Sequence, residues 1–146
     1  MIDSLKSTVT KIVGTFDDST GFSKGWHLKV RKSDLNFDAG DGSSRQTAAV
    51  WQTVEAGKWY HYAAVYTPGT GTVSLFLNGI KRTLNDTATA LSIIYPASPR
   101  TFISNPELPF AGVLDEVRLA STPRSEAWVR ACYESQRLEQ KMVTVE

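Results

Sequence analysis

The sequence predicts an all-β fold: an antiparallel β-sandwich or jelly roll that ends in one short C-terminal helix. Three observations indicate this class. Clusters of Gly, Pro, Ser, Asn and Asp recur along residues 1–120, at roughly the 8–12-residue spacing typical of sandwiches. The runs between these turns are short and rich in β-branched and aromatic residues. Apolar residues at helical spacing occur near the C-terminus.

Length and composition limit the classes of protein to consider. A chain of 146 residues has the size of one domain, so we expect a single domain over 1–146. Sixteen Lys+Arg against fifteen Asp+Glu give a net charge of +1, which argues against a nucleic-acid partner. No apolar run is long enough to predict membrane insertion. Cys132 is the single cysteine, so an internal disulfide and a cysteine-built zinc site are excluded.

The first half of the chain predicts strands at 11–16, 25–32, 35–39 and 46–54. The run 25–32 alternates, with apolar residues on one face and basic residues on the other. The apolar residues are Trp26, Leu28 and Val30, and the basic ones are His27, Lys29 and Arg31. The basic stripe would suit an acidic polysaccharide, but we interpret it as a solvated face. Residues 38–45 form a polar, Gly-rich stretch that predicts a recognition loop.

The middle of the chain predicts a hairpin of strands 58–67 and 72–78 around the turn at 68–71. Asn78 and Gly79 then form a type I′ turn, since both residues tolerate positive φ. Further strands are expected at 80–84, 91–94 and 101–104. The apolar run 110–120 predicts a long strand deep in a sheet. We assign Trp26, Trp59 and Trp128 to the core, and His61 to a satisfied buried position.

A different pattern begins at Ser125, which is a good N-cap residue and precedes Glu126 in the first turn. Apolar residues then share one helical stripe, which predicts a helix over about 126–136. The stripe consists of Trp128, Val129, Cys132 and Tyr133. Residues 142–145 predict one last strand.

Two runs resemble laminin-G-like domains of the concanavalin A-like lectin/glucanase superfamily. The run KWYHYAAVYTPGTGTVSLFLNG resembles the family's central signature, and FAGVLDEVRLASTPRSEAWVRACYESQ resembles its C-terminal signature. The resemblance covers roughly residues 11–145. It implies a jelly roll of the type found in large exported bacterial proteins, and therefore an extracellular or cell-surface location with other domains of the same polypeptide as neighbours. Family members usually begin with about two further strands, so we expect this chain to lack them.

The catalytic pattern of the superfamily's glucanases is absent. Those enzymes carry Glu-x-Asp-x-Glu, whose alternate carboxylates face one cleft. Asp115 and Glu116 are adjacent, so on a strand they point to opposite faces. His27 and His61 have no Gly-x-Ser-x-Gly partner. We therefore expect no enzyme activity.

The resemblance also implies a structural calcium ion at Asp115. Calcium binds six to eight oxygen atoms, of which this side chain would supply one or two. The alternative is that Asp115 caps a turn or pairs with Arg118. The acidic loops 17–18 and 38–41 are second candidates, although we interpret them as solvated turns.

Exposed aromatic residues are the candidates for sugar binding, because sugar rings stack their C–H faces on such rings. In the predicted hairpin, Tyr60, Tyr62, Tyr66 and Phe76 project away from the face of Trp59, Val65 and Leu75. A platform on these rings competes with the interpretation we favour, in which the helix covers them. The candidate ligand residues are Trp51, Asp38, Asp41, Tyr62 and Phe76.

Three functional hypotheses follow. The first is a non-catalytic module that binds glycan within a larger exported or surface protein; the resemblance supplies the glycan. The second is a structural or adhesion domain that contacts protein and has no sugar site. The third is an accessory domain of a polysaccharide-degrading enzyme. Burial of Trp51, Tyr62 and Phe76 would count against the first.

Overall fold

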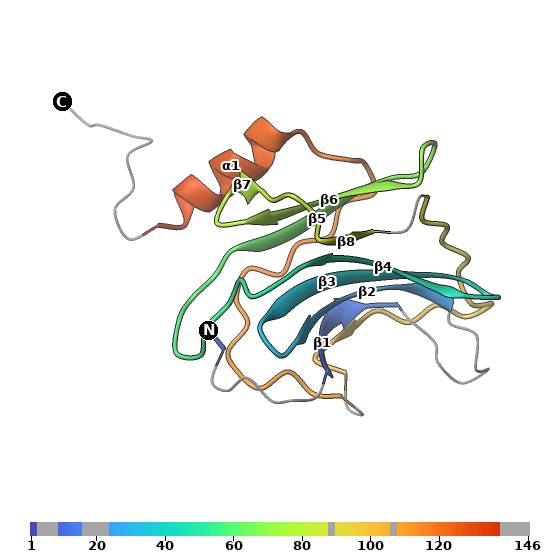
Figure 1. The fold of residues 1–146 in the computed structure, drawn as a ribbon, viewed down its shortest axis with the longest axis horizontal. Coiled ribbons are helices and arrows are strands. Elements are labelled where there is room, and N and C mark those ends of the chain that lie inside the picture. The colour runs from blue at the N-terminus through green and yellow to red at the C-terminus, as the bar shows by residue number, and fades with distance from the viewer. Residues whose placement is uncertain (3–8, 16–23, 88–89, 106–107, 138–146) are drawn as a thin grey trace.

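Two antiparallel sheets and one helix make up the fold, which confirms the predicted β-sandwich (Figure 1). The computed structural model describes residues 1–2, 9–15, 24–87, 90–105 and 108–137. The six-stranded sheet has the order β8-β4-β3-β2-β1-β9, and the three-stranded sheet has the order β5-β6-β7. The bounds are β1 Val9–Gly14, β2 Lys24–Arg31, β3 Asp34–Asp41, β4 Arg45–Val50, β5 Tyr62–Thr67, β6 Thr72–Leu77, β7 Ile80–Lys81, β8 Asp86–Thr87, β9 Phe102–Ile103 and α1 Glu126–Ser135.

The core lies between the two sheets. Phe37 and Val50 of the six-stranded sheet pack with Leu75 of β6 in the main buried cluster. The ring of Phe37 stacks on Trp26 with a centroid distance of 6.2 Å and on Tyr66 at 6.3 Å. A second cluster contains Ile2, Val30, Leu35, Val54 and Leu77. Burial of this apolar surface is the main stabilising contribution to the sandwich.

The hairpin of β2 and β3 decides what the outer face of the six-stranded sheet carries. Residues opposite each other across antiparallel strands share a face, and Leu28 lies opposite Phe37 on the core side. His27 lies opposite Asp38, and Asp38 lies opposite Thr47 of β4. Because side chains alternate along a strand, this second set projects from the face turned away from the three-stranded sheet.

The turn between β6 and β7 is the predicted type I′ turn. Its central residues have φ of 52° at Asn78 and 74° at Gly79. The side-chain Oδ1 of Asn78 accepts a hydrogen bond of 3.0 Å from the backbone N–H of His61. A Cβ on Gly79 would lie 2.8 Å from Cδ1 of Tyr133, so glycine here permits both the turn and the close approach of α1.

Helix α1 lies on the outer side of the three-stranded sheet (Figure 1). It begins where predicted, since the Ser125 Oγ accepts a hydrogen bond of 3.2 Å from the N–H of Trp128. Val129 is its buried residue. The prediction that Trp128 belongs to the core is wrong, and the same holds for Trp59; both are exposed, whereas Trp26 packs against the core.

The long strand predicted at 110–120 is wrong. Among the described residues, this stretch forms one isolated bridge, between Gly112 and Ile2. Val113, Val117 and Leu119 are exposed. The strand predicted at 91–94 is absent as well, and the short strand β8 was not expected. The strand predicted at 142–145 lies outside the described residues.

Candidate functional site

The five candidate ligand residues lie in separate places. Trp51 follows β4 and is exposed, whereas Asp38 is buried in the middle of β3. Tyr62 and Phe76 project to opposite faces of the three-stranded sheet, so they form no shared aromatic platform, and the favoured interpretation that the helix covers these rings is wrong for Tyr62. Tyr62 lies opposite Leu77 and packs on the core. Phe76 is buried on the face along which α1 lies.

The predicted recognition loop 38–45 is also wrong. Strand β3 continues to Asp41 and β4 begins at Arg45, which leaves a short connection of residues 42–44. The Asp41 Oδ1 accepts hydrogen bonds from the N–H groups of Ser43 and Ser44, at 2.8 and 2.6 Å. These bonds lower the pKa of the Asp41 carboxyl. The structure thus assigns Asp41 to closing a turn.

Trp51 lies at a groove with a volume of about 450 Å³. Its side chain is 54% exposed. The backbone N–H of Trp51 donates a hydrogen bond of 3.0 Å to Oδ1 of Asn85, and the backbone N–H of Asn85 donates one of 2.8 Å to the Ala49 carbonyl. Two cations and no carboxylate occur among the described lining residues. The lining consists of Val50, Trp51, Ile80, Lys81, Arg82, Thr83 and Asn85.

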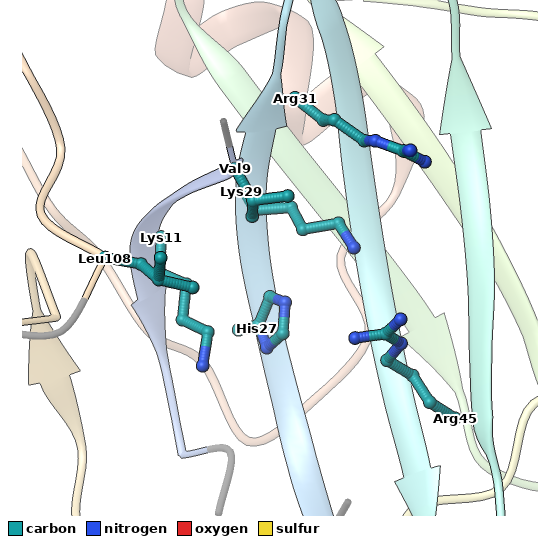
Figure 2. Close-up of a pocket in the computed structure, with 7 residues that line it drawn as sticks. All are labelled: Val9, Lys11, His27, Lys29, Arg31, Arg45 and Leu108. Atoms are coloured by element: carbon teal, nitrogen blue, oxygen red, sulfur yellow. The ribbon is translucent and has the colours of Figure 1, made fainter. Parts of the chain in front are cut away.

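A second cavity, of about 250 Å³, lies on the outer face of the six-stranded sheet (Figure 2). It is lined by Val9, Lys11, His27, Lys29, Arg31, Arg45 and Leu108. The backbone holds its wall together: the N–H of Lys11 donates a hydrogen bond of 2.9 Å to the carbonyl of Leu108. Segments far apart in the sequence therefore enclose one basic cavity.

Asp38 holds the cavity's polar side chains together. Its Oδ2 accepts a hydrogen bond from the ammonium of Lys29 and lies 3.2 Å from Nε2 of His27. Its Oδ1 accepts a bond of 2.9 Å from the Thr47 hydroxyl. The Nε of Arg45 lies 3.7 Å from Oδ2. The interpretation of Asp38 as a solvated turn residue is therefore wrong. Asp38 is the common partner of several side chains.

The same burial corrects the interpretation of the basic stripe on β2. His27 is 1% exposed and Lys29 is 5% exposed, so two of its three residues are buried and Arg31 alone is exposed. Desolvation lowers the pKa of His27, which favours the neutral imidazole. Desolvation also lowers the pKa of Lys29 against the opposing attraction of Asp38.

The Asp38 carboxyl behaves in the opposite way. Burial alone would raise its pKa, but the hydrogen bond and charge of His27, together with the charge and hydrogen bond of Lys29, lower it to about 2. Asp38 is therefore ionised at neutral pH. A buried carboxylate kept ionised by its neighbours is a fixed negative charge, around which the cationic side chains are ordered.

Of the two predicted structural roles for Asp115, capping is confirmed and pairing with Arg118 is not. Its Oδ1 accepts a hydrogen bond of 2.8 Å from the N–H of Glu116, which is local capping. The predicted pair with Arg118 is wrong, because Glu116 makes that ion pair at 2.7 Å. Asp115 is exposed. In the described part of the chain, no three His, Cys, Asp or Glu side chains gather as metal ligands, and the calcium ion stays a prediction.

The network around Asp38 was missed by sequence reasoning, although the sequence carried a signal for it. Folding the run 24–41 about Lys32 and Ser33 places His27 directly opposite Asp38. Pairing polar residues of opposite character across two predicted strands would have revealed their partnership. The burial of both residues had no such local signal, since Leu108 and Lys11 lie far from them along the chain.

The comparisons with known proteins concern the fold. Residues 1–130 match the profile of the laminin-G-like family described as the concanavalin A-like lectin/glucanases superfamily. None of the curated proteins matches the chain. The crystal structure of an S-layer domain-containing protein from Clostridium thermocellum is similar over 91% of this chain and 66% of that one, with 17% sequence identity and a TM-score of 0.36.

Within the described residues, no helix is long and apolar enough to cross a membrane. The family profile covers most of the chain, and the strands form the two-layered antiparallel sandwich that the family's signatures imply. This chain belongs to the laminin-G-like family of the concanavalin A-like lectin/glucanase superfamily.

Proposed function

We propose that this chain is a non-catalytic carbohydrate-binding module of a larger exported or surface protein, and that the Trp51 groove holds the sugar. The exposed indole of Trp51 beside polar side chains carries the proposal. Sugars present apolar C–H faces that stack on aromatic rings and hydroxyl groups that need hydrogen-bond partners. Of the candidate residues, Tyr62 and Phe76 lack this exposure, so the proposal now rests on Trp51.

The polar residues of the groove complement the ring. Lys81 and Arg82 are exposed on and after the edge strand β7 and offer N–H donors to hydroxyl oxygens. The Asn85 Oδ1 accepts a hydrogen bond from the backbone N–H of Trp51. That bond fixes the backbone at the position that carries the indole.

A second candidate function is contact with another protein. Its support is the run of apolar side chains on the surface after the Gly112 bridge, where Val113, Val117 and Leu119 are 38–57% exposed. A contiguous exposed apolar surface marks an interaction site, and these three residues are close along the chain. In this alternative the chain is a structural or adhesion domain, and the Trp51 groove binds no sugar.

The test compares Trp51→Ala with Trp59→Ala in a polysaccharide-gel binding screen. Trp59 is 55% exposed and does not line the groove, so it controls for nonspecific loss of an exposed indole. Loss of a tryptophan at the centre of a contact costs about 2 kcal/mol or more. We therefore expect affinity for the bound polysaccharide to fall at least about tenfold in Trp51→Ala and to stay unchanged in Trp59→Ala.

Equal effects of the two substitutions would contradict the groove proposal. If a folded sample is retarded in the gel by no polysaccharide, the result would favour the protein-contact alternative.

Running the screen with calcium and with EDTA tests the predicted calcium ion separately. Binding that EDTA abolishes, and that Asp115→Asn weakens, would support calcium at Asp115. Binding that survives EDTA would leave calcium no role in sugar binding. In an assay of polysaccharide hydrolysis, we expect the protein to release no reducing sugar.

A further inference from the structure

Most of the described side chains that line the cavity on the outer face of the six-stranded sheet are basic. Lys29, Arg31 and Arg45 line it together with Lys11 and His27, and no carboxylate occurs among the described lining residues. Asp38 lies beneath with no exposed surface. Lys29 and Arg45 share its single negative charge. The described cations that line the cavity therefore outnumber this carboxylate.

Figure 2 shows how these side chains lie. Lys29 on β2 and Arg45 on β4 extend toward each other over β3, the strand between them, and His27 lies beside Lys29 on β2. Arg45 is held at its Nε, 3.7 Å from Asp38, and is 55% exposed. Its guanidinium can therefore present N–H donors to the cavity while Asp38 fixes its position.

Stability alone does not account for this arrangement. Replacing a buried ion pair by apolar side chains of similar volume is often neutral or stabilising. The pair of Lys29 and Asp38 is buried on a sheet face with an open cavity beside it. Ordered cations around a cavity are the arrangement expected where a protein binds an anion.

We propose that this cavity binds the carboxylate of an acidic saccharide, with Arg45 as the residue that contacts it, Arg31 as a cation at the far end of the cavity, and Asp38 and Lys29 as positioning residues. The site is distinct from the Trp51 groove and does not depend on it. Asp38 already shows that this set of side chains accommodates a carboxylate. Arg presents paired N–H groups that match the two oxygens of a carboxylate.

The rim favours a sugar acid over an inorganic anion. Val9 and Leu108 add apolar surface to the lining. A uronic acid combines a C–H face with a single carboxylate, so it complements both parts of the cavity. An inorganic anion would use the charged part alone.

The experiment is calorimetric titration of the whole chain with the trimers of galacturonic, glucuronic and mannuronic acid. At least one trimer is expected to bind, and its neutral methyl ester is not. Arg45→Gln should lower the affinity about tenfold or more, since hydrogen bonds to charged groups are among the strongest. Arg31→Gln should lower it less, because Arg31 lies at the other end of the cavity, and Arg45→Lys should retain part of it.

Arg100→Gln is the matched control, because Arg100 is exposed and lines neither this cavity nor the Trp51 groove. It should leave binding of the trimer unchanged. Equal binding of acid and ester would overturn the proposal, as would equal losses in Arg45→Gln and Arg100→Gln. Binding of no trimer would also overturn it. Inorganic sulfate that competes as well as the trimer would overturn the assignment to a saccharide. Because Arg31 and Arg45 are exposed, both variants should fold, which thermal unfolding checks.

Discussion

The two faces of the six-stranded sheet are both buried at their centres but are stabilised by different physics. On the inner face, Phe37 and Ala39 pack against the second sheet. On the outer face, His27, Lys29 and Asp38 are just as inaccessible. Apolar burial contributes in proportion to area, whereas a buried polar group contributes only while its partner is present. Burial alone therefore does not identify a core, and the outer face is better understood as a built polar site.

The largest expected loss of stability comes from removing one partner of the buried ion pair between Lys29 and Asp38. Lys29→Met leaves the Asp38 carboxylate buried without its ammonium, and we expect the free energy of unfolding to fall by about 3–5 kcal/mol. The double substitution Lys29→Met with Asp38→Leu removes both charges and should recover most of that loss. Urea unfolding measures each variant. Lys81→Met, at an exposed position, is the control and should change little.

A double variant as unstable as Lys29→Met would show that the outer face is needed for folding itself. A stable double variant that fails to bind acidic trimers would instead separate stability from binding. That second result is the one expected if the polar face is kept for its cavity.

Acid should weaken the outer face in two steps. The folded-state pKa of His27 lies below its usual 6.5, so its contribution is complete above 6.5 and is lost as pH falls and the unfolded imidazole protonates. The pKa of Asp38 falls from 3.8 to about 2, so its contribution is complete above 3.8 and is lost as pH falls toward 2. The second step amounts to about 2 kcal/mol.

Urea unfolding at a series of pH values checks both steps. Asp38→Asn should remove the step below pH 4, since an amide does not titrate there. Leu75→Ala weakens the inner face, which owes its stability to apolar packing, and should lower stability at every pH without altering the slope. A step that persists in Asp38→Asn would assign the acid sensitivity to other carboxylates.

The comparison of faces also separates what the sequence could predict from what it could not. Period-two alternation correctly placed Trp26 and His27 on opposite sides of β2, and local chemistry located the turn at Asn78 and the cap at Ser125. These features depend on neighbouring residues. Whether a face is covered depends on distant ones, as Leu108 shows at the basic cavity. The sequence therefore predicted the fold class but not the Asp38 network, and sugar binding at Trp51 stays a prediction.

The strand predicted at 110–120 was wrong for the same reason, since coverage of a face depends on distant residues. The prediction with the smallest expected effect tests this explanation. Leu119 reads as a core strand residue by pattern, yet it is 57% exposed; strand preference takes effect only when a partner strand and a covering layer are present. Leu119→Ser should therefore change the free energy of unfolding by no more than about 0.5 kcal/mol. Leu75→Ala, at a fully buried leucine, should cost about 2–5 kcal/mol in the same urea experiment. A loss above about 1 kcal/mol in Leu119→Ser would show that this side chain is covered in solution, and the apolar surface that supports protein contact would then be part of the core.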